Sequence, residues 1–376
     1  MKLAVLKERR AGEARVAATA ETVKKFAGLG LAVTVETGAG EQACVSDDDY
    51  RAAGATIAPD AATALADADI VLKVRNPEPS EIAAMKSGVV LAGLLAPYTE
   101  KETIAALAAR GVSAFAMEFI PRISRAQAMD VLSSQANLAG YKAVIDAAAH
   151  FGRAMPMMMT AAGTIAPARV FIMGVGVAGL QAIATARRLG AIVSATDVRP
   201  ATKEQVESLG ATFVAVIDDE FKQAETAAGY AKEMSKEYQA KQAALVAETI
   251  KKQDIVITTA LIPGRKAPVL VSEEMVKTMK RGAIIVDLAV EQGGNCPLSK
   301  PDQIVDAYGV TIMGYTNLPA RLAVDTSNLY ARNLFNFVSL IVDKKSGALA
   351  LDWNDEIVKG AGLTRDGQIV HPALKG

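Results

Sequence analysis

The stretch RVFIMGVGVAGLQAIATARRLGAIVSATD, residues 169–197, decides the fold of this chain. It opens with a run of β-branched and aromatic residues, after which come Gly174, Gly176 and Gly179. An alanine-rich segment follows, and a second β-branched run ends at Asp197. The first glycine permits a tight turn, the second lets the backbone approach a pyrophosphate, and the third lets helix and strand pack closely. In this order the residues predict a strand, a helix and a parallel strand that bind a dinucleotide.

Two charged residues, one at the end of this stretch and one just after it, bear on which dinucleotide is bound. Asp197 ends the second predicted strand, where an acid accepts hydrogen bonds from the adenosine ribose hydroxyls and repels a 2′-phosphate. Arg199 could instead serve NADP, or could be an ordinary surface cation. Because a carboxylate that faces a phosphate is costly, we expect NAD(H), with its pyrophosphate at the amino end of the predicted helix.

The same alternation of β-branched runs and alanine-rich segments continues in both directions along the chain. It predicts an α/β protein with two Rossmann-like, doubly wound parallel-sheet domains. In the first series we expect strands at residues 3–6, 32–36, 70–74, 89–94 and 113–117. In the second series we expect strands at residues 170–173, 191–196, 212–216, 254–259, 283–288 and 310–313.

Two long amphipathic segments, residues 134–151 and 327–342, are predicted to be helices that join the two domains. The expected division is a discontinuous first domain, residues 1–133 with 316–376, and an NAD(H)-binding Rossmann domain, residues 134–315. These boundaries follow from the positions of the two joining helices, because the tail after the second helix is expected to return to the first domain.

Two segments do not follow the alternation. Residues 154–168 are rich in methionine and apolar, which is typical either of core packing or of an apolar arm for self-association. Residues 218–241 are polar and charged, and form either a solvated loop with a helix or a mobile lid over a ligand.

Composition excludes several classes of function. The 41 Lys and Arg residues balance 41 Asp and Glu residues, which gives no reason to expect nucleic acid as a partner. Cys44 and Cys296 lie far apart, so neither a disulfide framework nor a zinc site is expected, and we expect no metal. The best membrane-span candidate, residues 170–186, is short and interrupted by three glycines, so we predict no transmembrane helix and a cytoplasmic protein.

The chain also has few groups suited to acid–base catalysis. It contains two histidines: His150 ends the predicted helix at 134–151, and His371 lies in the tail. Dehydrogenases that oxidise alcohols or amines need a general base, which is often His or Lys. Hydride transfer between two nicotinamides moves no proton at the reacting carbons, and therefore needs only positioning.

Several long motifs resemble one family along essentially the whole chain. They are PRISRAQAMDVLSSQANLAGYKAV, PMMMTAAGTIAPARV, GVGVAGLQAIATA, TTALIPG and TRDGQIVHPAL. They resemble the NAD(H)-binding component of the proton-translocating transhydrogenase family. The resemblance implies an alanine-dehydrogenase-like arrangement of the two domains. It also implies an NAD(P)⁺ transhydrogenase that is active only with partner subunits.

In such an enzyme, hydride passes directly from NADH bound here to NADP⁺ bound on a partner subunit, without a flavin. Membrane-spanning subunits, which carry the NADP(H)-binding domain, couple this transfer to proton translocation. The resemblance further implies a homodimer, peripheral on the cytoplasmic face of the inner membrane.

The resemblance assigns roles to a polar loop. Arg122 and Asp130 would fix the nicotinamide carboxamide and ring, Ser133 would support them, and Gln127 would reach towards the second nucleotide. From the residues alone, the loop could equally be a polar helix start with Ser133 or Ser134 as N-cap. The residues expected to contact NAD(H) are Ile123, Gly174, Val175, Gly176, Val177, Gly179, Asp197, Val198, Arg199, Gly229, Tyr230, Gln242 and Leu261. Of these, Gly229 and Tyr230 would belong to the mobile lid.

Two alternative functions stay open at this point. Alanine dehydrogenases share the two-domain arrangement, and Arg15 and Lys73 stand at positions that resemble that family's substrate-binding residues. The histidine expected in that family is replaced by Leu95, which argues against amino-acid oxidation. A non-catalytic NAD-binding protein would keep the nucleotide site without needing the polar loop.

Overall fold

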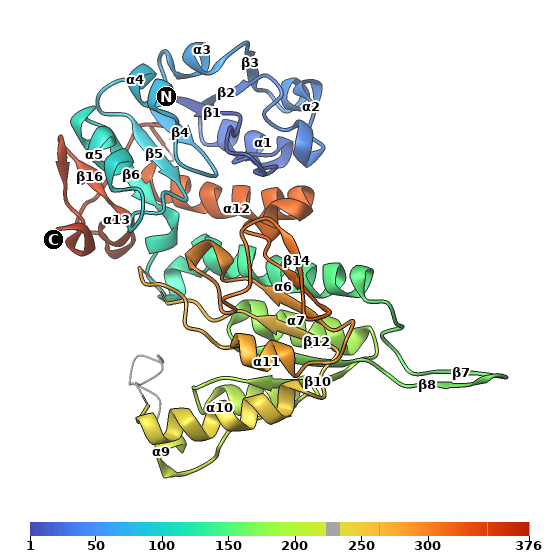
Figure 1. Cartoon of the computed structure of the whole chain (residues 1–376). Coiled ribbons are helices and arrows are strands. Elements are labelled where there is room, and N and C mark those ends of the chain that lie inside the picture. The colour runs from blue at the N-terminus through green and yellow to red at the C-terminus, as the bar shows by residue number, and fades with distance from the viewer. Residues whose placement is uncertain (223–233, 263, 344, 376) are drawn as a thin grey trace. The chain divides into compact units, whose positions relative to one another are not determined.

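The computed structural model describes residues 1–222, 234–262, 264–343 and 345–375, and the chain divides into two compact units. Unit 1 comprises Met1–Gln135 and Pro319–Gly376, and unit 2 comprises Ala136–Leu318 (Figure 1). Each unit is built on its own parallel sheet, which confirms the predicted α/β fold class.

Unit 1 contains a six-stranded parallel sheet in the order β3-β2-β1-β4-β5-β6. Its strands are β1 (Lys2–Val5), β2 (Ala32–Glu36), β3 (Thr56–Ala58), β4 (Ile70–Leu72), β5 (Val90–Gly93) and β6 (Ser113–Ala116). Its α-helices are α1 (Ala20–Gly28), α2 (Asp47–Ala52), α3 (Ala61–Leu65), α4 (Pro79–Ala84), α5 (Lys101–Ala109), α12 (Ala323–Ile341) and α13 (Glu356–Ala361).

Helices cover both faces of this sheet because successive side chains of a strand point to opposite faces. Leu3 and Val5 pack with α1 and α12, whereas Ala4 and Leu6 pack with α3 and α5. After α12, the chain returns to β6, where the backbone N–H of Leu363 donates to the Ala114 carbonyl at 2.8 Å. A short hairpin of β16 (Thr364–Arg365) and β17 (Gln368–Ile369) follows.

Unit 2 contains a seven-stranded sheet in the order β11-β10-β9-β12-β13-β15-β14, in which only β14 is antiparallel. Its strands are β9 (Arg169–Met173), β10 (Ile192–Thr196), β11 (Thr212–Phe213), β12 (Ile255–Thr258), β13 (Ile284–Asp287), β14 (Ile304–Ala307) and β15 (Val310–Met313). Its α-helices are α6 (Val131–His150, which begins in unit 1), α7 (Val177–Arg188), α8 (Thr202–Ser208), α9 (Asp219–Lys222), α10 (Lys236–Ile250) and α11 (Glu273–Lys277).

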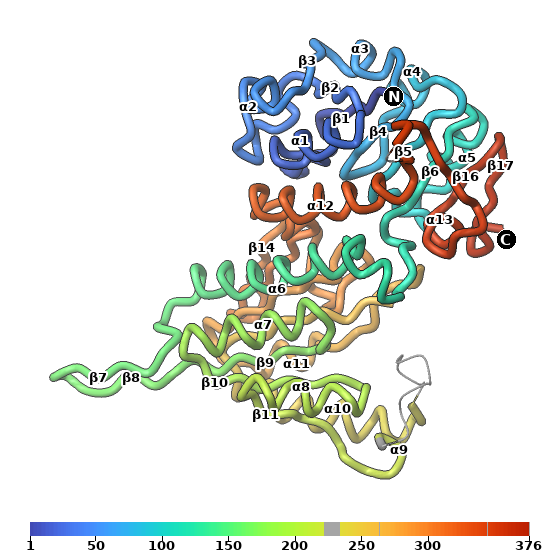
Figure 2. The backbone as a smooth tube through the Cα atoms, turned by 180° about the vertical axis from the view of Figure 1, so that it is seen from behind, coloured from blue at the N-terminus to red at the C-terminus, as the bar shows by residue number. Residues whose placement is uncertain are grey.

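Both faces of this sheet are likewise covered. Val170 and Ile172 of β9 pack with α6 and α7, while Phe171 and Met173 pack with α10 and α11. Helices α6 and α7 lie side by side (Figure 2). They approach so closely that a Cβ on Gly140 would lie 2.0 Å from the Ala178 carbonyl oxygen.

The methionine-rich segment is a hairpin of β7 (Met158–Thr160) and β8 (Gly163–Ile165) that extends from unit 2 as a narrow ribbon (Figure 1). Core packing is wrong for this hairpin, because Met157, Met158 and Met159 are 55%, 41% and 79% exposed, whereas Met155 and Ala168, which flank it, are buried in the core of unit 2. Self-association through this arm stays a prediction.

The polar segment 218–241 contains α9 and the start of α10. Gly229 and Tyr230, which we expected in a lid, lie outside the described residues. In the portion of the chain that the structure describes, no helix has the length and apolar character that crossing a membrane requires.

Candidate functional site

The turn after β9 is built from glycines that its neighbours make necessary. Gly174 has a φ of +102°, and a Cβ there would lie 2.6 Å from the Thr259 hydroxyl oxygen. A Cβ on Gly179 would lie 1.9 Å from the Gly174 carbonyl oxygen. Any side chain at either position would therefore push strand, turn and helix apart, as the fingerprint predicted.

Gly176 plays a different role, because it has open space around it. No atom lies within 4 Å of the place that a Cβ on Gly176 would occupy, and its φ of −80° is ordinary. Gly176 is the N-cap of α7 and has no side chain that could accept from the N–H groups of the first turn. The first-turn N–H groups of a helix lack intrahelical partners, so this end of α7 combines room with donors and a positive dipole end.

Asp197 lies directly after β10, and its carboxylate reaches back to the glycine turn. Its Oδ2 accepts from the Val175 backbone N–H at 2.7 Å, and its Oδ1 accepts from the Arg199 backbone N–H at 2.9 Å. The Arg199 guanidinium donates to both oxygens, from Nε at 2.9 Å and from Nη2 at 3.0 Å. Arg199 is therefore not the plain surface cation that was one of its two expected roles.

The loop after β12 forms a further wall beside the turn. The Thr259 hydroxyl donates to the Gly174 carbonyl at 2.9 Å, and Leu261, two residues on, is 47% exposed. Val198, after β10, is 44% exposed, and Val177 at the start of α7 is 39% exposed. The predicted residues Gly174 to Gly179, Asp197 to Arg199 and Leu261 thus all follow the carboxyl ends of three neighbouring strands, where ligands of open α/β sheets bind.

Two buried residues that the sequence did not single out hold this wall in place. The Asn295 side chain accepts from the Ala260 N–H at 3.1 Å and donates to the Ala260 and Pro268 carbonyls at 2.9 and 2.8 Å. Asp287 accepts from the Asn295 and Cys296 N–H groups at 2.9 and 3.0 Å. The sequence signal for them is the glycine and proline content of residues 258–268 and 287–297, which follow two predicted strands.

Gln242 of α10 is engaged inside unit 2. Its Oε1 accepts from the Val216 N–H at 2.9 Å, and its Nε2 donates to the Thr196 hydroxyl at 3.0 Å. The side chain therefore braces the end of β10, next to Asp197, against the segment after β11.

The polar loop of unit 1 surrounds a 3₁₀ helix, η3 (Ser124–Met129), and leads into α6. Asp130 accepts from the Ser133 N–H at 2.9 Å and from the Ser133 hydroxyl at 2.5 Å. A helix does start here, but Asp130 caps it rather than Ser133 or Ser134. Arg122 and Gln127 are exposed, and Ile123 is half-buried.

Helix α12 fixes the other side of this loop. Asn333 and Asn336 each donate to the Ala128 carbonyl, at 2.8 and 3.1 Å, and the Ser134 hydroxyl donates to Asn333 at 2.7 Å. Ala126 and Met129 are buried beneath the loop. The exposed polar side chains are therefore carried on a backbone that is held at several points.

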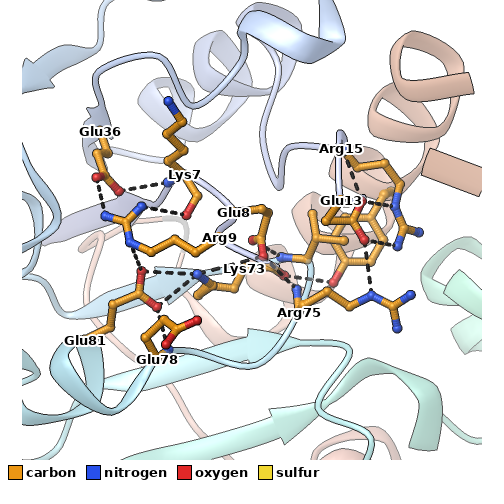
Figure 3. A network of polar contacts seen from close by, with 12 residues as sticks. Lys7, Glu8, Arg9, Glu13, Arg15, Glu36, Lys73, Arg75, Glu78 and Glu81 are labelled. Atoms are coloured by element: carbon orange, nitrogen blue, oxygen red, sulfur yellow. Dashed lines mark hydrogen bonds and ion pairs between the residues drawn. The ribbon is translucent and has the colours of Figure 1, made fainter. Parts of the chain in front are cut away.

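Unit 1 also contains a buried network of charges, which includes the two alanine-dehydrogenase-like residues (Figure 3). The Arg15 guanidinium donates to Glu13 from Nε and Nη2, both at 2.7 Å, and its Nη1 donates to Gln135 at 2.8 Å. The Lys73 ammonium lies 3.0 Å from a Glu81 oxygen and 3.8 Å from a Glu8 oxygen. Both cations are thus already neutralised by carboxylates of the same chain.

The pKa of the Glu8 carboxyl, which belongs to this network, is raised. Burial raises its pKa to about 7, although the Lys73 charge and the hydrogen bonds from the Val74 and Arg75 N–H groups lower it. Leu95, which lies where we expected a histidine in an alanine dehydrogenase, is fully buried. Its backbone N–H donates to Glu118 at 3.2 Å.

Each of the two histidines contacts a backbone carbonyl of the same unit. His150 contacts the Asp146 carbonyl one turn earlier in α6 at 3.0 Å, and His371 contacts the Gly360 carbonyl at 3.1 Å. Burial lowers the pKa of His371, whose ring lies 4.6 Å from that of Phe119. Among the described residues, no group of three or more His, Cys, Asp or Glu side chains is arranged to hold a metal ion.

Comparison with known proteins gives consistent matches. Residues 4–139 match the family described as alanine dehydrogenase/PNT, N-terminal domain, and residues 143–372 match its C-terminal domain. The chain is 59% identical to a Rhodospirillum rubrum protein that is the first portion of NAD(P) transhydrogenase subunit alpha, covering 100% of this chain and 99% of that protein. It is 30% identical to the alanine dehydrogenase of Halomonas elongata, and the match covers 100% of this chain and 96% of that protein.

A solved structure, the transhydrogenase from Sinorhizobium meliloti, is also similar to the chain. It has a TM-score of 0.90 and 53% sequence identity, covering 98% of this chain and 100% of that one.

Proposed function

This chain belongs to the alanine dehydrogenase/PNT family and, within it, to the NAD(P) transhydrogenase alpha subunits; on that premise we propose that it presents NADH for direct hydride transfer to NADP⁺ on a partner subunit. Its role is that of the NAD(H)-binding component. The observation that carries the proposal is the glycine turn of unit 2, with open space at Gly176 and the Asp197 carboxylate beside it.

Unit 2 would bind the adenosine and pyrophosphate moieties of NADH. The N–H groups at the start of α7 donate to the pyrophosphate, and Gly176 leaves the room for it to approach. Asp197 would accept from the ribose hydroxyls in place of the two hydrogen bonds that it now accepts from the Arg199 guanidinium, because its four present bonds occupy the lone pairs of both oxygens. Val198 and Leu261 add exposed apolar surface beside the turn.

The polar loop of unit 1 would serve the nicotinamide end. Arg122 and Asp130 hold the carboxamide and ring, Ser133 supports Asp130, and Gln127 reaches towards the second nucleotide. The Asp130–Ser133 hydrogen bonds and the support from α12 keep these groups in place, which matters because the reaction depends on positioning. A hydride carries two electrons from C4 of NADH to C4 of NADP⁺, so these residues need not move a proton.

The partners follow from the same assignment. The Rhodospirillum relative is named as one portion of a divided alpha subunit, which implies further transhydrogenase subunits. We expect a homodimer, peripheral on the cytoplasmic face of the inner membrane. It would bind membrane-spanning subunits that carry the NADP(H)-binding domain and couple hydride transfer to proton translocation.

Alanine dehydrogenase activity is the less favoured alternative. The chain keeps Arg15 and Lys73, but Glu13 and Glu81 already neutralise them in the interior of unit 1. Leu95 cannot act as the acid or base that oxidation of an amine requires. The buried ion pairs therefore favour a structural role for this region of unit 1.

The test is an isotope experiment with the purified chain and the NADP(H)-binding domain of its partner. NADH that carries deuterium on the transferred position of C4 should deliver that deuterium to NADP⁺ without exchange into water. The chain alone should show no rapid transfer between free nucleotides. Substantial loss of deuterium to solvent would contradict direct transfer and refute the proposal.

A further inference from the structure

The four hydrogen bonds that Asp197 accepts define an anion site that the protein fills with its own carboxylate. The donors are the backbone N–H groups of Val175 and Arg199 and two nitrogens of the Arg199 guanidinium, all within 3.0 Å. The side chain of Asp197 is 8% exposed and that of Arg199 is 30% exposed. A charged fork and two fixed N–H groups therefore converge on one small, nearly buried position.

Contacts other than those with the carboxylate also hold Arg199. The Arg199 carbonyl accepts from the Thr202 hydroxyl at 2.6 Å and from the Thr202 N–H at 3.2 Å, which fixes its backbone at the start of α8. The Arg199 guanidinium also donates to the Val175 carbonyl at 3.2 Å. Removal of the Asp197 side chain would leave a guanidinium anchored to the glycine turn.

We propose that Arg199 is a latent determinant of NADP(H) binding, which Asp197 silences by occupying the site of a 2′-phosphate. The proposal rests on the NAD(H) site assigned above, because the end of β10 is where such a site meets the adenosine ribose. NADPH is then excluded by a carboxylate that takes the cation as its own partner and repels a second anion. The cation itself is present.

The measurement is the dissociation constant of NADH and of NADPH for the full chain, from the fluorescence of the reduced nicotinamide. We compare the wild type with Asp197→Ala, Asp197→Asn and the double variant Asp197→Ala/Arg199→Ala. Asp197→Ala should bind NADPH at least tenfold more tightly than the wild type does, and NADH more weakly. Asp197→Asn should gain much less affinity for NADPH, because its carboxamide still lies among the same hydrogen-bond donors.

The double variant decides whether Arg199 is responsible. It should lose the affinity for NADPH that Asp197→Ala gains; equal affinities of the single and double variants would overturn the proposal. If Asp197→Ala does not fold, Asp197→Ser, whose hydroxyl can still accept from the Val175 N–H, replaces it with the same expected gain. If the wild type binds NADH but neither Asp197→Ala nor Asp197→Ser binds NADPH more tightly than the wild type, this inference alone is refuted. A wild type that does not bind NADH refutes the proposed function.

Discussion

The two units place different residues after equivalent strands. In unit 1, β1 lies between β2 and β4, and in unit 2, β9 lies between β10 and β12, with the same order of parallel strands around them. Leu6, Lys7 and Glu8 follow β1, whereas Gly174, Val175 and Gly176 follow β9. The pairings of Val5 with Val35 and of Met173 with Thr196 make Glu36 the counterpart of Asp197.

The acidic anchor is the same in both units. In unit 1 the Lys7 N–H donates to Glu36 at 2.9 Å, and in unit 2 the Val175 N–H donates to Asp197 at 2.7 Å. Each carboxylate also pairs with an arginine, Arg9 in unit 1 and Arg199 in unit 2. An acid at the end of the second strand is therefore not by itself evidence of a nucleotide site.

The turn makes the difference between the two units. In unit 1 the Glu8 carboxylate fills the edge of the sheet and accepts from the Val74 and Arg75 N–H groups at 2.7 and 3.2 Å. The next helix, α1, begins only at Ala20, so the turn after β1 does not lead straight into a helix. In unit 2, glycines leave the turn open and α7 begins at once. In unit 1 the backbone N–H groups at this edge of the sheet donate to Glu8, whereas in unit 2 the N–H groups at the start of α7 stay available for a ligand.

Removal of the central cation of unit 1 should give the largest change in stability. Arg15→Met removes the cation that makes two 2.7 Å hydrogen bonds to the buried Glu13, which keeps its contact with Arg75 at 3.1 Å. Leaving a buried charge with no partner costs about 3–5 kcal/mol in the free energy of unfolding, so we expect a loss towards the lower end of that range. Urea denaturation followed by circular dichroism measures this loss. NADH binding at unit 2 should stay unchanged under conditions in which the variant is folded.

Arg51→Met is the matched control, because Arg51 pairs with Asp48 where both side chains are more than half exposed. Its expected cost is below about 1 kcal/mol. A small effect of Arg15→Met on stability, together with a large effect on ligand binding, would show that the unit 1 network is itself a ligand site.

Glu8 should make stability depend on pH. Its pKa of about 7 in the folded protein is raised by burial above the ordinary 4.5. The folded state therefore binds the proton more tightly, so the contribution of Glu8 is complete below about pH 4.5 and is lost as pH rises through 7. Between pH 5.5 and 8 the free energy of unfolding should fall by about 1–2 kcal/mol relative to that of Glu8→Gln.

The comparison with Glu8→Gln is needed because burial also raises the pKa of Glu118, which adds to the same trend in both proteins. Parallel curves for the wild type and Glu8→Gln would mean that Glu8 keeps one protonation state across this range. The titration of Glu8 would then contribute nothing to the pH dependence of the free energy of unfolding.

Local patterns predicted the sheets well because most strands are short β-branched runs that are buried on both faces. The strand at residues 32–36 has the observed bounds of β2, and the fingerprint strands differ from β9 and β10 by one residue. The three-residue β3 and the antiparallel β14 escaped prediction. Both are partly exposed and depend on pairing with a neighbour, which the sequence of the strand alone does not reveal.

Other features depend on contacts between distant residues. The methionines of β7 look like core residues, and nothing in their local sequence says that they form an exposed hairpin. The sequence offered two roles for Arg199, but its bond to Asp197 depends on the conformation of the turn after β10. Asn295 and Glu8 act on segments 35 and 66 residues away, at Ala260 and Val74. Residue types alone do not identify such partners.

The smallest change in stability should come from Gly176→Ala, which tests whether the open turn of unit 2 is reserved for a ligand. The new methyl group meets no atom within 4 Å, and the backbone there is compatible with alanine. The free energy of unfolding should therefore change by less than about 1 kcal/mol, because the preference of an N-cap for glycine opposes the entropic gain from replacing glycine. NADH binding should nevertheless weaken by roughly tenfold or more, because the pyrophosphate has to approach the backbone at this residue.

Gly152→Ala is the matched control, since Gly152 also lies in unit 2 with nothing within 4 Å of its Cβ position and no positive φ. Fluorescence titration with NADH and thermal unfolding of both variants separate the two effects. Equal NADH affinity for Gly176→Ala and Gly152→Ala would mean that the space beside Gly176 is unused. The contrast between a filled turn in unit 1 and an open one in unit 2 would then no longer explain where the nucleotide binds.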